Sequence, residues 1–289
     1  MEKVVIIGLG LMGGSMAKDL KALGHYHIWG IDQNKIHEQK ALQLGFIDEV
    51  VNIQKITEAN WVILAVPVNY LPSLAVEVLD LININTIVFD MGSIKNPLGK
   101  AIKNHPNRSQ FIAAHPIAGT ENSGPSAAVN QLFKNKLTII CEPNLSCSQK
   151  LAQTIQLWKS IGARVQFMES EEHDKHLAYV SHLSHISSFM LGKTVLEIEK
   201  DERQIFNLAG SGFESTVRLA KSAPPTWAPI FLQNHQYILQ SLDEYIHNLQ
   251  QFRNLIFQQD EQQLKTIMHQ CNYVGEILAG IALNNHQEP

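Results

Sequence analysis

The chain has 289 residues, of which 45% are hydrophobic, and a formal net charge of −4 at pH 7. A chain of this length is expected to form two domains with their own cores. Its lysines and arginines are scattered rather than clustered, which argues against a protein that binds nucleic acid or an anionic membrane surface.

The first residues predict a site for a dinucleotide. Lys3–Ile7 is typical of a buried strand, and residues 8–13 then carry the pattern G-x-G-x-x-G before a segment with helical spacing. Gly8 would allow a sharp turn, and Gly10 would allow the backbone to approach a pyrophosphate. Gly13 would let the helix pack closely on the strand, while the helix N-terminus offers free N–H groups. A glycine-rich turn that packs and binds nothing is the alternative.

A second predicted strand, Ile28–Ile31, ends at Asp32. This aspartate follows the glycines by about 20 residues, where a carboxylate accepts hydrogen bonds from the ribose hydroxyls of a dinucleotide. Because a carboxylate in this place repels a 2′-phosphate, we predict that the cofactor is NAD rather than NADP.

The N-terminal half alternates short apolar runs with helical spacing, which is typical of a parallel sheet with helices on both faces. Further strands are predicted over Glu49–Val51, Trp61–Val66, Ile87–Phe89 and Phe111–Ala114, and helices include Gln33–Leu44 and Tyr70–Leu79. Leu137–Cys141 and Arg164–Met168 flank a predicted helix, Ser148–Ile161, and are expected to extend the same sheet. We therefore predict an α/β Rossmann-type NAD-binding domain over residues 1–168.

After about Met168 no further β-rich run appears. Ser170 is the predicted N-cap of a long helix that continues to about Lys200, with acidic residues in its first turn. The centre of this helix, Leu177 to Leu191, is apolar or small nearly all round, which predicts burial on several sides. Other helices are predicted over Glu202–Leu208, Trp227–Leu249 and Glu261–Leu283. We therefore predict an all-α domain over residues 169–289, which completes its core by forming a homodimer.

Three cysteines, Cys141, Cys147 and Cys271, have no spacing typical of a metal site and cannot all pair. This favours a reducing, cytoplasmic location. The apolar N-terminus is not expected to be a signal peptide, because Glu2 is acidic and glycines interrupt the run. The sequence has no apolar run of about 18 residues, so no membrane-spanning helix is expected.

Polar residues follow several predicted strands, at the edge of the sheet where ligands bind in open α/β folds. Ser93 follows one strand and His115 follows another. Both side chains can transfer protons, and histidine has an ordinary pKa that suits acid–base chemistry at neutral pH. Ala65 and Pro67 end a third strand and are expected to contact the cofactor. We predict that His115 is catalytic rather than a histidine that only stabilises a turn.

The long helix of the second domain carries four histidines: His173, His176, His182 and His185. On a straight helix only the last two share a face, so we predict no metal site. One of these two is expected to be a core residue and the other to face a cleft. Arg218, which follows a flexible glycine loop, is a candidate for binding a carboxylate, with a surface ion pair as the alternative. Trp227 is most simply a packing anchor.

Several motifs together resemble those of the prephenate/arogenate dehydrogenase family. They are Gly8-Leu9-Gly10-Leu11-Met12-Gly13-Gly14-Ser15, Asp90-Met91-Gly92-Ser93-Ile94-Lys95, His115-Pro116-Ile117-Ala118-Gly119-Thr120-Glu121, His173-Asp174, Val180-Ser181-His182-Leu183-Ser184-His185, and Gly212-Phe213 before Arg218. The resemblance covers about residues 3–275 in the order and spacing of the family, and the segment that begins at His115 is its most diagnostic part.

The resemblance implies an NAD-dependent oxidative decarboxylation of prephenate to 4-hydroxyphenylpyruvate, in tyrosine biosynthesis, by a homodimer. It implies that His115 accepts the proton of the substrate hydroxyl, that Ser93 bridges this hydroxyl and the nicotinamide region, and that Arg218 holds a substrate carboxylate. The other substrate-binding residues it implies are His185, Thr120, Glu121 and Trp227, the last of which would reach the site of the neighbouring subunit. The cofactor would contact Gly8, Gly10, Leu11, Met12, Gly13, Asp32, Ala65, Pro67 and Ser93.

One segment departs from the family pattern. Where the family often has Arg-Asp-Thr-Thr-Arg, this chain has Glu214-Ser215-Thr216-Val217-Arg218, so an aspartate is replaced and the last arginine is kept. Neither a chorismate mutase domain nor a regulatory domain is expected, which predicts a monofunctional enzyme.

Three other functions are considered. Arogenate dehydrogenase is the nearest, and His185 favours prephenate, because members of the family that prefer prephenate tend to carry histidine there. A β-hydroxyacid dehydrogenase would place a catalytic lysine in the first helix of the second domain, where this chain offers histidines. An NAD-binding sensor would need no proton acceptor, so Ser93, His115 and Arg218 together argue against it.

Overall fold

The computed structural model describes residues 1–120, 122–200 and 205–285. The chain divides into two compact units, Met1–Ile238 and Leu239–Pro289. The domain boundary predicted at residue 168 lies inside the first unit and stays a prediction. Glu121 and the first residues of the helix predicted over Glu202–Leu208 lie outside the described residues, and Ile205–Leu208 forms a 3₁₀ helix.

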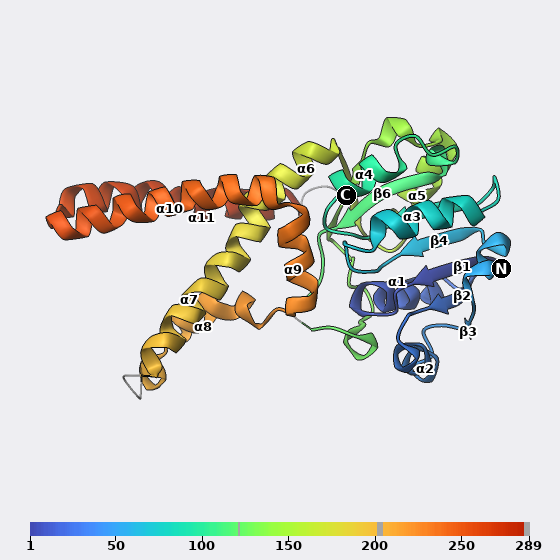
Figure 1. Ribbon diagram of the computed structural model, residues 1–289, viewed down its shortest axis with the longest axis horizontal. Helices are drawn as coiled ribbons and strands as arrows, with labels where there is room; N and C mark the ends of the chain where they lie inside the picture. Colours follow the sequence, from blue (N-terminus) through green and yellow to red (C-terminus); the bar gives the residue numbers. More distant parts are fainter. Residues whose placement is uncertain (121, 201–204, 286–289) are drawn as a thin grey trace. The chain divides into compact units, whose positions relative to one another are not determined.

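The first unit contains an eight-stranded sheet with the order β3-β2-β1-β4-β5-β6-β7-β8 (Figure 1). Its strands are β1 (Glu2–Ile7), β2 (Tyr26–Ile31), β3 (Glu49–Val50), β4 (Trp61–Leu64), β5 (Ile87–Asp90), β6 (Phe111–Pro116), β7 (Leu137–Cys141) and β8 (Arg164–Met168). All eight predicted strands are present. The order of the first six is that of a Rossmann fold, which confirms the predicted fold class.

The strands β1 to β6 are parallel, whereas β7 is antiparallel to β6 and β8 is parallel to β7. The expected extension of the sheet is confirmed, but a wholly parallel sheet is wrong for its last two strands. A parallel neighbour requires a crossover, usually through a helix. The described part of the connection from β6 to β7 contains only the 3₁₀ turn Pro125–Ala127, so the chain returns in the opposite direction.

Helices cover both faces of the sheet because the strands are apolar on both sides. Val4 and Ile6 belong to one buried cluster, and Val5 and Ile7 belong to another, as expected for side chains that alternate along a strand. The first cluster includes residues of α1 (Leu11–Ala22), α2 (Lys35–Gln43) and α5 (Ser148–Ser160), and the second includes residues of α3 (Leu71–Leu81) and α4 (Asn96–Ile102).

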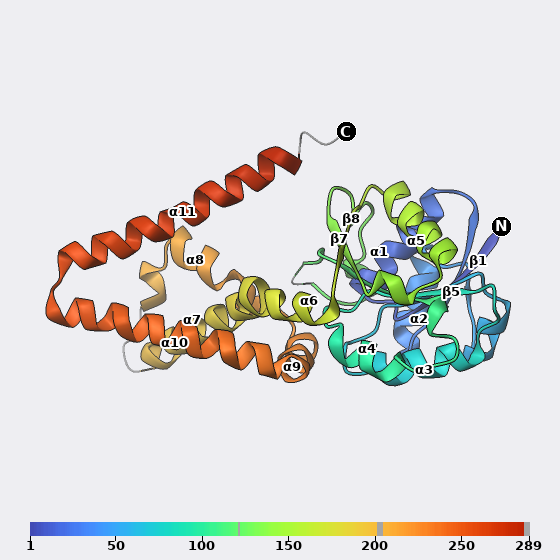
Figure 2. The ribbon, with the colours of Figure 1, turned by 90° about the horizontal axis from the view of Figure 1, so that it is seen from above.

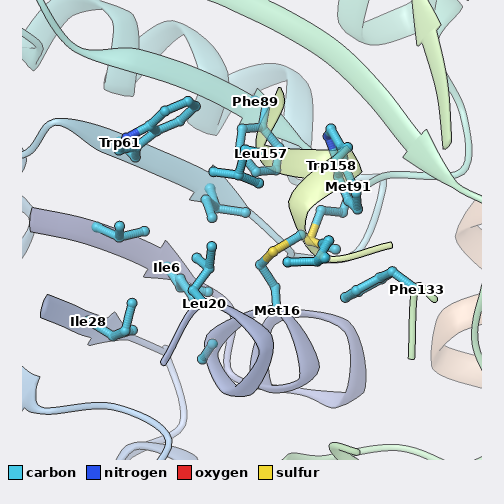
Figure 3. Packing of buried hydrophobic residues seen from close by; sticks show 14 of the residues in the cluster. Ile6, Met16, Leu20, Ile28, Trp61, Phe89, Met91, Phe133, Leu157 and Trp158 are labelled. Atoms are coloured by element: carbon cyan, nitrogen blue, oxygen red, sulfur yellow. The ribbon is translucent and has the colours of Figure 1, made fainter. Parts of the chain in front are cut away.

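Figure 3 shows the first cluster, in which Met16 and Leu20 of α1 lie against the sheet. The indole of Trp158, on α5, lies between two other aromatic rings. Its centroid is 5.6 Å from that of Phe89 and 5.4 Å from that of Phe133, both within the range of favourable aromatic pairs. This packing holds β5 in place, the strand that leads to the predicted site.

The chain after the sheet in the first unit is helical, with several changes of helix type. Its helical segments are α6 (Ser170–Leu177), a π-helical turn (Ala178–His182), α7 (Leu183–Glu199), α8 (Ser211–Val217), a 3₁₀ turn (Arg218–Lys221), α9 (Pro224–Gln233) and the beginning of α10 (His235–Gln258). The helix predicted over residues 170–200 is helical throughout but changes to π-helical geometry at Ala178–His182, whereas the one predicted over residues 227–249 is two helices that meet at Asn234.

Two details of the predicted long helix are wrong. Glu169, not Ser170, is the N-cap, and the backbone N–H of Ser170 donates instead to Glu142 from before α5, at 3.0 Å. A carboxylate that is distant in the sequence thus accepts a hydrogen bond from a free N–H group at the start of the helix. Burial on several sides is also wrong within one chain, because Val180 is 73% exposed and Met190 is 51% exposed.

The second unit consists of α10 from Leu239 onward and α11 (Glu261–Asn285). The two helices are joined by a turn at Gln259, whose φ is 55°, and Asp260 (Figure 2). No helix in the described ranges combines the length and apolarity that a membrane crossing needs.

Candidate active site

The turn between β1 and α1 has room for glycine alone at two positions. Gly8 has a φ of +97°, and a Cβ there would lie 2.4 Å from the carbonyl oxygen of Ala65. A Cβ at Gly13 would lie 1.9 Å from the carbonyl oxygen of Gly8. At Gly10, by contrast, a Cβ would meet no described atom within 4 Å, so the backbone is open to a ligand. Since α1 begins at Leu11, its free N–H groups lie at this opening.

Asp32 is held beside the glycine turn. Its Oδ2 accepts a hydrogen bond from the backbone N–H of Leu9 at 2.8 Å, and its Oδ1 accepts one from Asn34 at 2.9 Å. Gly8 and Ala65 directly follow β1 and β4, and between these strands the order of the sheet reverses, which is where dinucleotides bind in this fold. The residues therefore fit a dinucleotide at the predicted place.

His115 lies near the end of β6 and contacts a second histidine. Its Nδ1 is 2.9 Å from Nε2 of His173, on α6, and Nδ1 of His173 is 2.8 Å from Oδ1 of Asp174. His173 and Asp174 are buried, whereas His115 is partly exposed. The structure thus places two buried polar residues behind the predicted base.

Asp174 and Lys95 fasten this arrangement to the sheet. The carboxylate of Asp174 accepts hydrogen bonds from the backbone N–H groups of Lys95 at 2.9 Å and Asn96 at 2.8 Å, where α4 begins. The fully buried ammonium of Lys95 forms an ion pair with Asp90 and donates to the carbonyl of Ala114 at 2.6 Å. The residue before His115 is therefore tied to the end of β5.

His182, in the π-helical turn, is buried and lies 3.1 Å, by its Nδ1, from Nδ2 of Asn234. The same amide donates to the backbone carbonyl of Asp174 at 2.7 Å. His185 is partly exposed and stacks on Trp227 with the ring centroids 3.3 Å apart. One histidine of this pair is thus a core residue, as predicted, and Trp227 is a packing partner of the other.

Burial favours the neutral form of these imidazoles. It lowers the pKa of His115 well below its usual range, and the neighbouring His173 lowers this pKa further. Burial likewise lowers the pKa of His182 to about 4. For His185 the lowering of the pKa by burial is increased by the charge of Arg218, which is exposed nearby. Near neutral pH the cluster therefore presents neutral imidazoles next to one exposed guanidinium.

The other predicted residues lie around this cluster or beside the glycine turn. Ser93 is partly buried in the loop between β5 and α4, and Thr120 and Pro67 are exposed. A Cβ at Gly119 would lie 3.9 Å from Sδ of Met12, so the loop after His115 lies near the first turn of α1. Glu121 is outside the described residues.

Sequence reasoning did not assign roles to His173, Asp174, Lys95 and Asn234. Their signal in the sequence is weak: His173-Asp174 was part of the family pattern, and Lys95 ends the motif that contains Ser93. The contacts join residues that are 58 and 79 positions apart, which no local pattern could reveal.

The chain matches two family models in succession. The model described as "Prephenate dehydrogenase, nucleotide-binding domain" matches residues 16–167. The model described as "Prephenate dehydrogenase, dimerization domain" matches residues 169–270.

Individual relatives of this chain carry names that agree with the two family models. A cyclohexadienyl dehydrogenase of Zymomonas mobilis is 32% identical over 263 residues, covering 90% of each chain. A prephenate dehydrogenase of Bacillus subtilis is 32% identical over 269 residues, covering 91% of this chain and 72% of the relative. A solved structure of Aquifex aeolicus prephenate dehydrogenase, in complex with hydroxyphenyl propionate and NAD⁺, superposes with a TM-score of 0.89 at 31% identity, covering 96% of this chain and 98% of the other. This protein belongs to the prephenate dehydrogenase family.

Proposed function

We propose that this protein catalyses the NAD-dependent oxidative decarboxylation of prephenate to 4-hydroxyphenylpyruvate, a step of tyrosine biosynthesis. The observation that carries the proposal is the cluster around His115, a neutral imidazole near the carboxyl end of β6 that contacts His173, with Arg218 near His185 of α7. The Aquifex aeolicus relative, which was solved with NAD⁺ and hydroxyphenyl propionate, supports the same chemistry.

The cofactor is NAD, which accepts a hydride when it is bound. The open backbone at Gly10 and the free N–H groups of α1, next to Leu11 and Met12, would hold its pyrophosphate. Asp32 would accept hydrogen bonds from the ribose hydroxyls, because a carboxylate has further acceptor positions beyond the two backbone contacts it already makes. Ala65, Pro67 and Ser93 are proposed to lie toward the nicotinamide.

His115 would remove the proton of the ring hydroxyl of prephenate while the carbon that bears this hydroxyl loses its hydrogen as hydride. The resulting ketone would lose the ring carboxylate as CO₂. The electrons of the broken C–C bond make the ring aromatic and leave a phenolate, which takes back a proton. Ser93 is proposed to hydrogen bond the same hydroxyl and so orient it toward the imidazole.

Arg218 would bind a carboxylate of the substrate, since a guanidinium offers two parallel donors to a carboxylate. Its charge acts on His185, which is proposed to contact the side chain of the substrate. Thr120, Glu121 and Trp227 are proposed to complete the pocket. Arogenate, which carries an amino group in place of the keto oxygen, is the alternative substrate.

The experiment that tests the function measures NADH formation by the purified protein with prephenate and with arogenate, each with NAD and with NADP. Turnover of prephenate with NAD would support the proposal. A preference for arogenate would keep His115 and Arg218 in their roles and remove the argument from His185. No turnover of either compound would contradict the proposal.

Replacing Asp32 with serine is expected to raise the ratio of kcat/KM with NADP to kcat/KM with NAD by about tenfold or more, because it removes a charge that repels a 2′-phosphate. Steady-state kinetics with both cofactors measure the ratio. Asp48→Ser is a matched control, since the Asp48 carboxylate also accepts a backbone hydrogen bond from β2, at Ile28. A ratio unchanged in Asp32→Ser would argue against the ribose role.

The pH dependence should follow the low pKa of His115. The neutral imidazole is the active form, so a pKa lowered by burial and by the facing His173, Lys95 and His182 keeps the base active to lower pH. At saturating NAD we expect kcat/KM to lose activity only well below the ordinary histidine pKa of about 6.5. An acidic limb centred at or above that value, and absent from the residual activity of His115→Asn, would contradict this prediction.

The active form is proposed to be a homodimer. The matching family model describes a dimerization domain, and apolar side chains are exposed along α10 and α11, among them Ile256, Phe257 and Leu278. Sedimentation equilibrium would test this, and a monomer at assay concentration would contradict it. A cytoplasmic location is also part of the proposal, because Cys141, Cys147 and Cys271 are free thiols.

A further inference from the structure

A hydrogen-bonded series of three side chains leads from the base into the protein interior. Asp174, His173 and His115 are linked in this order, with 2.8 Å between Asp174 Oδ1 and His173 Nδ1, and 2.9 Å between His173 Nε2 and His115 Nδ1. Each imidazole has one nitrogen that carries a proton and one that does not when it is neutral. Which partner donates in each contact therefore decides which nitrogen of His115 carries no proton.

Asp174 sets which groups donate and which accept in these hydrogen bonds. One of its oxygens accepts the backbone N–H of Lys95 and the other accepts the backbone N–H of Asn96. Because both oxygens act as acceptors, the proton in the contact with His173 comes from Nδ1 of that imidazole. Burial favours the neutral form of His173, so its Nε2 is an acceptor. The contact with His115 then requires a proton on Nδ1 of His115, which leaves Nε2 without one.

We propose that His173 and Asp174 are positioning residues that hold His115 in the tautomer whose Nε2 accepts the substrate proton. The inference rests on the proposed function, because it assigns these residues to the base of that reaction. The logic is that of a catalytic triad, in which a buried carboxylate fixes the tautomer and orientation of the catalytic imidazole. Here a second imidazole stands between the carboxylate and the base.

Further hydrogen bonds around these three residues support a fixed orientation of the His115 imidazole. The carboxylate of Asp174 caps the start of α4, and Asn234 holds the backbone carbonyl of the same residue. Lys95 ties the residue before His115 to Asp90 of β5. Asp174 is therefore attached to the segment between β5 and α4, and the residue before His115 is attached to β5. The charge of Asp174 would also stabilise the imidazolium that forms when His115 takes a proton.

The test is His173→Leu, which removes the acceptor for Nδ1 of His115 and keeps an apolar side chain in a buried place. We expect kcat for prephenate to fall by about 10- to 100-fold, as is typical when a partner that orients a functional histidine is lost. The KM for prephenate and the Kd for NAD should stay within about threefold, because neither ligand is proposed to contact His173.

A spectroscopic readout separates tautomer control from a structural role. In the ¹⁵N spectrum of the NAD-bound enzyme, His115 should show a protonated Nδ1 and an unprotonated Nε2, assigned through the loss of its signals in His115→Asn. In His173→Leu the Nδ1 should lose this fixed protonation. An unchanged tautomer, or an unchanged kcat, would overturn the proposal.

Two further variants complete the design. His176→Leu makes the same change at an exposed histidine of α6 and should alter neither kcat nor the spectrum of His115. His173→Gln, whose amide oxygen can accept a hydrogen bond, should recover part of the lost kcat and provides the measurement if the leucine variant does not fold. Full activity of His115→Asn would contradict the proposed function. An inactive His115→Asn, together with wild-type activity of His173→Gln and His173→Leu, would contradict only the positioning role.

Discussion

Replacing His115 with asparagine should lower kcat for prephenate by about 10²- to 10⁴-fold, which is the usual contribution of a general base. The asparagine amide cannot take up the hydroxyl proton. Since His115 is proposed to act on the substrate and not on the nucleotide, the Kd for NAD should change by no more than about twofold. Stopped-flow or steady-state measurement of NADH gives kcat, and a fluorescence titration gives the NAD affinity.

The outcome is informative in both directions. An equal loss of turnover and of NAD affinity would mean that His115 supports the cofactor site rather than the chemistry. The exposed His176 provides a matched control, because His176→Asn makes the same substitution away from the cluster and should leave both quantities unchanged. A thermal unfolding curve of His115→Asn checks that the loss is not a loss of folded protein.

Replacing Arg218 with glutamine should raise the KM for prephenate by about 10- to 100-fold, with a smaller change in kcat. The substitution removes a hydrogen bond between charged groups, which contributes about 1.5–3 kcal/mol. Tenfold corresponds to about 1.4 kcal/mol, so the expected range of KM follows from that energy. Arg218 is exposed, so we expect little change in stability.

Steady-state kinetics at saturating NAD measure this effect. Lys221→Gln is the matched control, because Lys221 is an exposed cation in the same 3₁₀ turn and is not proposed to bind substrate. Arg218→Lys should give an intermediate KM, since lysine keeps the charge and loses the two parallel donors. A normal KM and kcat in Arg218→Gln would remove this arginine from the site.

The sequence determined the parts of the protein that depend on neighbouring residues. The glycine turn and Asp32 belong to one βαβ unit, in which turn geometry and strand length fix the position of each residue relative to the next. The central strands could be predicted because apolar runs buried on both faces have a distinct composition. His115 could be predicted to lie at the same edge of the sheet as the glycine turn, because the carboxyl ends of parallel strands meet at one edge of the sheet.

The tertiary structure decided what depends on residues distant in the chain. The reversal at β7 follows from the absence of a crossover helix in the described connection after His115. The π-helical turn at Ala178–His182 alters the helical positions that a straight helix would give to the histidines.

The contacts of His115 with His173, and of Asp174 with Lys95, join separate elements. Local patterns report the conformation of a segment and the face it buries. Which buried polar groups meet is decided by packing, because each must find a partner when water is excluded.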